Sequence, residues 1–169
     1  MFILGHVGIG THLVPKRIRE ALPWRWLALG CLLPDLVDKP IWFALRSSAE
    51  SALAPTARLF GHTIFFAALL AILAALLRKP ALCALAWGVP THLLLDVLSD
   101  YGLGGRGIWR LWLCWPWRLR IPRLFPPSAS VLDHFAAELS APVYVAGEII
   151  GALLLLWDWR HRKSRPSGP

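Results

Sequence analysis

The sequence predicts an all-α integral membrane helical bundle with about three to five membrane-embedded helices and an N-terminal part that is broken or re-entrant. Hydrophobic residues make up 56% of the 169 residues, charged residues only 17%, and the mean hydropathy is +0.53. This composition is too apolar for an ordinary soluble domain of the same length. Ten tryptophans, most of them near the ends of apolar runs, are typical of membrane–water interfaces.

The length predicts one domain. We expect a single membrane-embedded helical domain over residues 1–160 and a basic disordered tail over residues 161–169, which are rich in Arg, Pro and Gly. The net charge is +8, but the basic residues lie mostly between apolar runs and not along one stripe. This distribution favours membrane lipids as partners, and no nucleic acid is expected. The three cysteines are isolated, so neither a disulfide framework nor a zinc finger is predicted.

Two apolar stretches, 60–77 and 81–98, predict antiparallel membrane helices joined by the short turn Arg78-Lys79-Pro80. Each has about 18 residues, near the lower limit for crossing a bilayer. Pro90 lies inside the second stretch and is expected to kink that helix. A third helix is expected over 142–159, where the basic tail stops it.

The stretch 24–45 is apolar enough to enter a membrane, but Pro34, Asp35, Asp38, Lys39 and Pro40 interrupt it. It predicts a broken helix, which is tolerated only where protein or a polar cavity covers the break. Residues 46–59 are expected to form a polar connection. Residues 99–140, rich in Gly, Trp, Arg and Pro, are expected to lie along the interface.

His92 and Asp96 lie inside the second apolar stretch, and their spacing of four residues places both on one helix face, about 6 Å apart along the axis. Burying an imidazole and a carboxylate in hydrocarbon is costly unless each has a partner. A metal ion bound by both would be such a partner. The alternative is a His–Asp hydrogen bond that locks a helix interface.

The hairpin brings a further histidine to this pair. His62 lies 17 residues before Lys79 and Asp96 lies 17 residues after it (79 − 62 and 96 − 79). At equal rise per residue the two side chains share one depth on neighbouring helices. We therefore expect His62, His92 and Asp96 to converge at the end of the hairpin opposite the turn.

Other polar residues leave alternatives open. Asp35 and Asp38 are three apart and could share a face as ligands, or form a helix cap with Asp38 in solvent. His6 and His12 are six apart and would point to different sides of a helix, so at most one is expected to be a ligand. Glu148 could be a ligand, an arginine partner or a protonated acid.

The stretch 109–123 interleaves tryptophans and prolines with arginines, among them Arg118 and Arg120. A guanidinium group suits phosphate oxygens, and Trp suits the headgroup layer. The stretch is either a general interface anchor or a clamp for a substrate phosphate. Asp133 and His134 follow in a polar region, where a surface role is expected.

Several of these pieces, in order, resemble a LexA-regulated, YdjM-like family of inner-membrane proteins regarded as metal-dependent hydrolases, with a distant similarity to zinc-dependent phospholipase C. The resembling pieces are Gly5-His6 and the segments 32–38, 58–63, 88–96 and 113–122. The resemblance implies that the metal-site positions are His6, Asp35, Asp38, His62, His92 and Asp96. It also implies a bacterial or archaeal inner-membrane location.

This chain departs from the family pattern at two places. A second residue, Val37, separates the two aspartates, and Lys39 stands where a histidine is usual. Ala57 and Leu59 replace a histidine and a glycine before His62. Fewer ligands imply one metal in place of two, or a degenerate site.

The expected function is membrane-bound, metal-dependent hydrolysis of a phosphoester in a lipid or lipid-linked substrate, with one or two divalent ions, by preference Zn²⁺. Asp38 is expected to act as a ligand or general base. The arginines Arg58, Arg118 and Arg120 are expected to steady phosphate charge. The alternative is a non-catalytic membrane protein, either a metal carrier or a scaffold with a structural metal site. Basic residues occur at both ends of the predicted helices, so their distribution does not fix which side the site faces.

Overall fold

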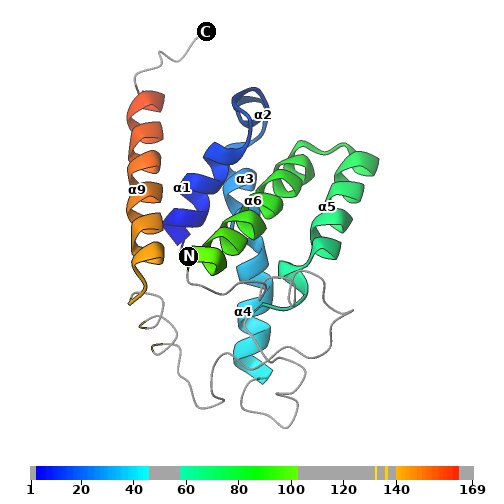
Figure 1. Cartoon of the computed structure of the whole chain (residues 1–169). Helices are drawn as coiled ribbons and strands as arrows, with labels where there is room; N and C mark the ends of the chain where they lie inside the picture. Colours follow the sequence, from blue (N-terminus) through cyan, green and yellow to red (C-terminus); the bar gives the residue numbers. More distant parts are fainter. Residues whose placement is uncertain (1–2, 46–57, 103–131, 133–135, 137–139, 164–169) are drawn as a thin grey trace.

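A computed structural model describes residues 3–45, 58–102, 132, 136 and 140–163 of the chain (Figure 1). These residues form helices and no strand, which confirms the predicted all-α class. The elements are α1 (Ile3–Leu13), α2 (Lys16–Ala21), α3 (Trp24–Gly30), α4 (Leu33–Leu45), the short 3-10 helix η2 (Phe60–His62), α5 (Ile64–Leu77), α6 (Pro80–Gly102) and α9 (Pro142–Lys163).

Two of these helices are long and apolar enough to cross a membrane: α6 over Pro80–Tyr101 and α9 over Pro142–His161. Helix α5 is apolar but shorter than these two. It begins at Ile64 and not at residue 60, because residues 60–62 form η2. The Thr63 hydroxyl then caps α5 by accepting the Phe66 N–H at 3.1 Å.

The predicted break in the N-terminal part is confirmed, but it lies earlier than expected. Helix α3 ends at Gly30 and α4 begins at Leu33, so the chain breaks before Pro34. Proline in the first turn of a helix is tolerated, because its missing N–H would have no partner within the helix. Pro40 and Pro90 both lie inside helices, α4 and α6, and end neither.

The last helix is longer than predicted. Helix α9 continues to Lys163, so the first three residues of the expected disordered tail are helical. Three predicted segments lie outside the described residues: the end of the tail (164–169), residues 46–57 of the polar connection, and most of the interfacial segment after Gly102.

Helices α1 and α9 pack closely through glycines. A Cβ on Gly8 would collide with the Gly151 carbonyl oxygen, and one on Gly5 would lie 3.2 Å from the Gly147 carbonyl oxygen. Gly147 and Gly151 have the small-xxx-small spacing that lets membrane helices approach closely. Helix α1, which carries His6, is therefore fixed against a membrane-spanning helix.

Glu148 acquires a structural role that its sequence position left open. Its two carboxylate oxygens accept the backbone N–H groups of Leu4 at 3.0 Å and Gly5 at 2.7 Å. These N–H groups belong to the first turn of α1 and have no partner within that helix. Glu148 therefore caps α1 from the neighbouring helix, and its negative charge complements the α1 dipole.

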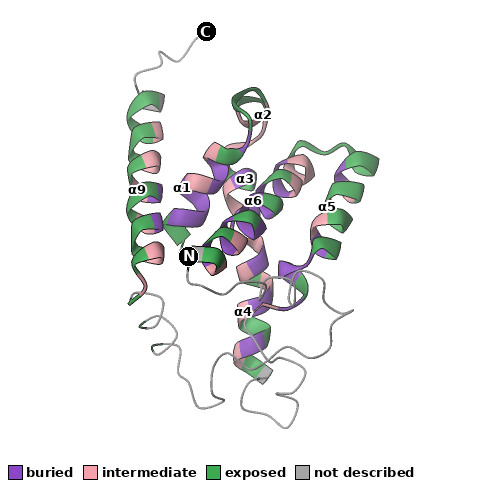
Figure 2. Ribbon diagram, viewed as in Figure 1, coloured by how far each residue is buried: buried purple, intermediate pink, exposed green. Residues whose placement is uncertain are grey.

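The outer faces of α5 and α9 are exposed (Figure 2), and many of the exposed residues there are large and apolar. Only 11% of the apolar span of α9 is buried against the rest of the chain. Exposed apolar faces that extend along whole helices are unfavourable in water and favourable in lipid. The faces include Ile64, Phe65, Leu69, Ile72, Leu76, Ile149, Ile150, Leu153 and Leu156.

Two small cores hold the inner helices together. Phe66 and Leu70 of α5 pack against Val89 and Leu93 of α6. Near the N-terminal end of α6, Leu27 of α3 packs against Val14 and Ala84. Helices α3 and α6 also cross very closely, because a Cβ on Gly88 would lie 2.6 Å from the Gly30 carbonyl carbon. This crossing places the break after α3 directly beside the middle of α6.

We predict that Gly8→Val displaces α1 from α9, because the added side chain meets the Gly151 backbone. Overpacking of this kind costs about 1–3 kcal/mol. Thermal unfolding of the detergent-purified protein should show a Tm several degrees lower than wild type. Ala146→Val, at an exposed position of α9, is the control and should leave the Tm unchanged. Equal Tm values for the two variants would contradict this packing.

Candidate metal centre

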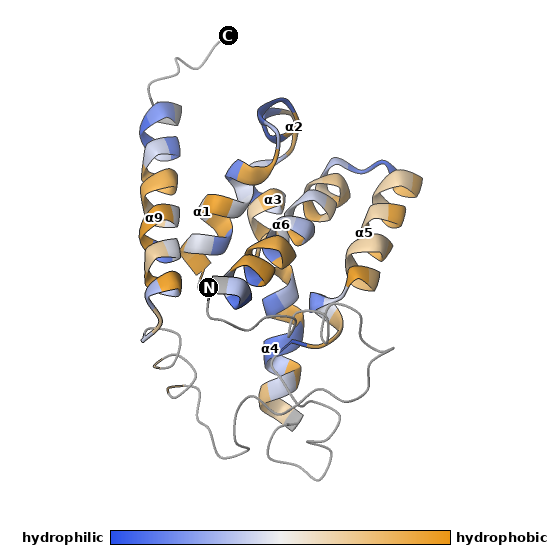
Figure 3. Cartoon of the chain, in the orientation of Figure 1, coloured by the Kyte–Doolittle hydropathy of each residue, from blue (hydrophilic) through white to orange (hydrophobic). Residues whose placement is uncertain are grey.

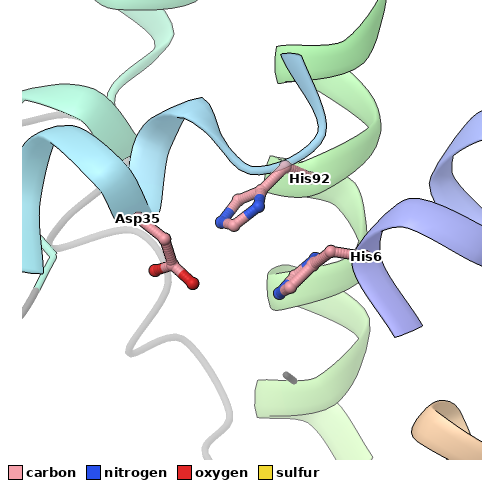
Figure 4. Close-up of side chains that lie close together, drawn as sticks. All are labelled: His6, Asp35 and His92. Atoms are coloured by element: carbon pink, nitrogen blue, oxygen red, sulfur yellow. The ribbon is translucent and has the colours of Figure 1, made fainter. Parts of the chain in front are cut away.

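Five side chains from four elements converge beside the break after α3. His6 comes from α1, Asp35 from α4, His62 from η2, and His92 and Asp96 from α6. The three histidines and Asp96 are buried, and Asp35 is partly buried. Figure 4 shows His6, Asp35 and His92 turned toward one another from their three helices.

The distances place His62 near the middle of this cluster. Its Nε2 atom lies 3.2 Å from His92 Nε2, 3.4 Å from Asp35 Oδ1 and 3.5 Å from Asp96 Oδ2. The predicted proximity of His62, His92 and Asp96 is therefore confirmed. His6 completes the cluster: its Nε2 lies 3.5 Å from Asp96 Oδ1, and its ring stacks on that of His92 with centroids 3.9 Å apart.

Neighbouring acceptors set the tautomers of two histidines. His62 Nδ1 lies 2.7 Å from Asp38 Oδ2, and His92 Nδ1 lies 2.7 Å from the Cys31 carbonyl oxygen. A carboxylate and a carbonyl only accept hydrogen bonds, so each Nδ1 must carry the proton and donate it. In the neutral rings both Nε2 atoms therefore point lone pairs into the cluster, as metal-ligating histidines do.

His6 is the least satisfied of the three rings. Within the described part of the chain, neither of its ring nitrogens has a hydrogen-bond partner, although the side chain is 1% exposed. Burial, with a further contribution from His92, holds the pKa of His6 well below its ordinary value. A neutral imidazole with an unused nitrogen is a ready metal ligand.

Asp38 does not lie among the atoms that face the centre. Its Oδ2 accepts the Leu59 N–H at 2.6 Å, the His62 N–H at 3.1 Å and the His62 ring, and its Oδ1 accepts the Gly61 N–H at 2.7 Å. These bonds use both carboxylate oxygens to hold the η2 turn. The expected role of Asp38 as ligand or general base thus gives way to a role in positioning His62.

Arg58 pairs with the acids of α6. Its Nε lies 3.0 Å from Asp96 Oδ2, and its Nη1 donates to both oxygens of Asp100 at 2.9 and 2.8 Å. Sequence reasoning missed Asp100, although its spacing of four from Asp96 places it on the same helix face. On α4, Lys39 donates to Asp35 at 2.8 Å. Both candidate carboxylate ligands therefore have a basic neighbour.

Of the other predicted residues that the structure describes, His12 does not join the cluster. His12 faces Asp158 at 3.4 Å and donates from Nδ1 to the Gly8 carbonyl oxygen at 2.8 Å, so only His6 of that pair reaches the cluster. Arg118, Arg120, Asp133 and His134 lie outside the described residues.

Two overlapping sets of three ligand atoms could each hold a metal ion. They are His6, Asp35 and His92, and His62, His92 and Asp96, with the ligand atoms of each set within 4.8 Å of one another. Nitrogen and carboxylate oxygen donors in such proximity are typical of Zn²⁺ and similar divalent ions. His92 belongs to both sets.

Apolar helices arranged around a buried histidine–aspartate cluster define an integral membrane protein with a candidate metal centre. Residues 1–163 match the model of a family described as YdjM inner membrane protein. The chain belongs to this family, as its sequence motifs predicted, and the predicted inner-membrane location is that of the family.

Among its relatives are the inner membrane proteins YdjM of Escherichia coli strain K12 and of Shigella flexneri. Each is 35% identical over 138 residues, which cover 73% of this chain and 60% of the relative. The chain thus spans less than two thirds of the length of these relatives. No solved structure matches.

We predict that Asp38→Asn destabilises the protein by about 2–4 kcal/mol, since the amide cannot accept all the buried N–H groups that the carboxylate accepts. Thermal unfolding in detergent should show a lower Tm, and zinc affinity should fall about 10–100-fold because His62 loses its orientation. Asp158→Asn removes an acid at the far end of α9 and should change neither quantity. Unchanged zinc affinity in Asp38→Asn would contradict the positioning role.

Proposed function

We propose that this chain is a membrane-bound, metal-dependent hydrolase that acts on a phosphoester of a lipid or lipid-linked substrate. The observation that carries the proposal is the buried cluster of three imidazoles and two carboxylates, in which the Nε2 atoms of His62 and His92 lie 3.2 Å apart. A divalent cation at the centre would bind these donor atoms together and offset their mutual repulsion.

Zinc is the proposed ion because imidazole nitrogen and carboxylate oxygen are its usual donors in hydrolytic sites. The nearby Cys31 thiol is not among the proposed ligands. It lies 3.5 Å from the Thr91 hydroxyl, and the Cys31 carbonyl oxygen accepts a hydrogen bond from His92. The residues that would hold the ion are His6, His62, His92, Asp35 and Asp96.

One ion, not two, fits these residues. His92 is shared by both sets of ligand atoms, and its Nδ1 already donates to the Cys31 carbonyl oxygen. Only Nε2 is left to bind a metal, and a nitrogen lone pair binds one ion. The departures from the family pattern at Lys39 and Ala57 point to the same number.

A divalent ion at this centre would supply Lewis-acid polarisation of a phosphoryl oxygen and a water molecule of lowered pKa. Arg58 and Lys39 would provide positive charge at the edge of the centre. Their side chains are 18% and 28% exposed, whereas those of His62 and His92 are fully buried. A phosphate group would therefore approach the centre from the side of Arg58 and Lys39.

A structural metal is the second candidate. Five potential ligands exceed the three that a catalytic zinc site commonly uses, and four protein ligands would close the coordination sphere. The ion pairs of Arg58 with Asp96 and of Lys39 with Asp35 also neutralise charge that a substrate would otherwise meet.

We predict close to one zinc ion per chain in protein purified in detergent without chelators, measured by inductively coupled plasma mass spectrometry. His92→Ala removes a ligand common to both sets and should reduce the zinc content to near zero. His12→Gln changes another histidine of the same bundle and should retain one ion. Two ions per chain, or full zinc content in His92→Ala, would overturn the single-ion site.

We also predict that zinc-loaded protein in lipid nanodiscs hydrolyses at least one substrate in a screen of phospholipids and lipid phosphates. Chelation of the metal should lower the rate by about 100-fold or more, and re-addition of zinc should restore it. His12→Gln should keep the wild-type rate. A zinc-loaded protein that turns over no phosphoester would instead favour the structural metal.

A further inference from the structure

We infer that a second site, at the end of the bundle opposite the metal centre, binds a phospholipid headgroup that carries both a phosphate and an ammonium group. The site is a cavity of about 540 Å³ between α2, the start of α3 and the end of α9. This volume lies within the range of small-molecule sites, roughly 300–1,000 Å³. Its charged and aromatic lining includes Lys16, Arg19, Glu20, Trp157, Asp158 and His161.

The cavity lies at the level where a membrane span ends. The apolar span of α9 runs over Pro142–His161, and the cavity is lined by residues of its last turn. Figure 3 shows the hydrophilic colours of α2 and of the C-terminal end of α9 next to the apolar middle of the bundle. This is the depth at which lipid phosphates lie and at which Trp and basic residues gather.

The cavity is remote from the metal centre. Helix α1 separates the two sites: His6 near its start reaches the cluster, whereas His12 near its end faces Asp158 of the cavity lining at 3.4 Å. The two sites therefore share no residue. A ligand at the cavity would not occupy the proposed catalytic site.

The charges in the lining favour a zwitterion. Lys16 and Arg19 are three residues apart on α2, so they share a face and can contact one phosphate together. Glu20 and Asp158 contribute an equal number of negative charges, which suit an ammonium group. A headgroup with a net negative charge would meet the phosphate-binding cations but also both acids.

The aromatic residues match the rest of the lipid. Trp24 and Trp157 line the cavity from α3 and α9, and Leu22 adds an aliphatic surface between α2 and α3. Trp157 also stacks on His161 with ring centroids 4.0 Å apart, which fixes its ring beside the cavity. Indole rings contact glycerol and the first methylene groups favourably, and their faces attract an ammonium group.

The test is calorimetric titration of the full chain in detergent, as purified and with its metal content unchanged. The probe is a short-chain phosphatidylethanolamine, with phosphatidylglycerol and inorganic phosphate as separate arms. We expect saturable binding of phosphatidylethanolamine to one site. Phosphatidylglycerol should bind at least about fivefold more weakly, because the acids repel it, and inorganic phosphate should not saturate.

Two variants connect this binding to the cavity. Arg19→Gln removes a lining cation and should raise the Kd for phosphatidylethanolamine at least about fivefold. Arg17→Gln removes the exposed charge two residues away, which does not line the cavity, and should leave the Kd within about twofold. Unfolding scans of both variants confirm that they fold alike.

Equal Kd values for Arg19→Gln and Arg17→Gln would overturn the inference. So would binding of phosphatidylglycerol as tight as that of phosphatidylethanolamine, or saturation by inorganic phosphate alone. These outcomes are distinguishable from a failure of the proposed hydrolase, since Arg19 and Arg17 both lie outside the metal centre and the measurement follows binding and not turnover.

Discussion

The Nε2 atoms of His62 and His92 face each other at 3.2 Å, between two carboxylates and away from water. Asp38 and the Cys31 carbonyl oxygen orient the two rings, because each accepts the Nδ1–H of one histidine, and in the neutral rings both Nε2 atoms then carry lone pairs. In a low-dielectric interior such a concentration of acceptors is strongly unfavourable without a positive charge. A divalent cation would offset the repulsion at these atoms, which supports the proposed metal site.

The close helix crossings make this cluster possible. Gly30 and Gly88 let α3 approach α6, which brings the Cys31 carbonyl oxygen within reach of His92. Gly8 and Gly151 let α1 lie against α9, while Glu148 caps α1 and fixes the helix that carries His6. A membrane interior provides little hydrophobic force between helices, so packing of small residues and polar contacts of this kind must hold them together. The glycines and Glu148 are thus as important to the centre as its ligands.

Much of the fold and of the site could be predicted from the sequence, and the failures have physical causes. The assumption of equal rise along both arms of the hairpin predicted that His62 lies beside Asp96. The two side chains do lie 3.5 Å apart, although His62 belongs to the 3-10 helix η2 and not to α5. Spacing along one element cannot show which face of a broken segment turns inward, so Asp38 was expected at the metal and lies behind His62. The caps and partners that Glu148 and Asp100 provide depend on contacts between distant segments, which no local pattern encodes.

X-ray absorption spectroscopy at the zinc edge of the loaded protein tests the central claim most directly. The account predicts a first shell of nitrogen and oxygen alone, at about 2.0–2.1 Å, with the outer-shell scattering of two or three imidazole rings. His92→Ala and His62→Ala should each remove this signal, whereas His12→Gln should preserve it. A sulfur scatterer at about 2.3 Å, or a zinc shell without imidazole, would show that the ion binds elsewhere and would contradict the account.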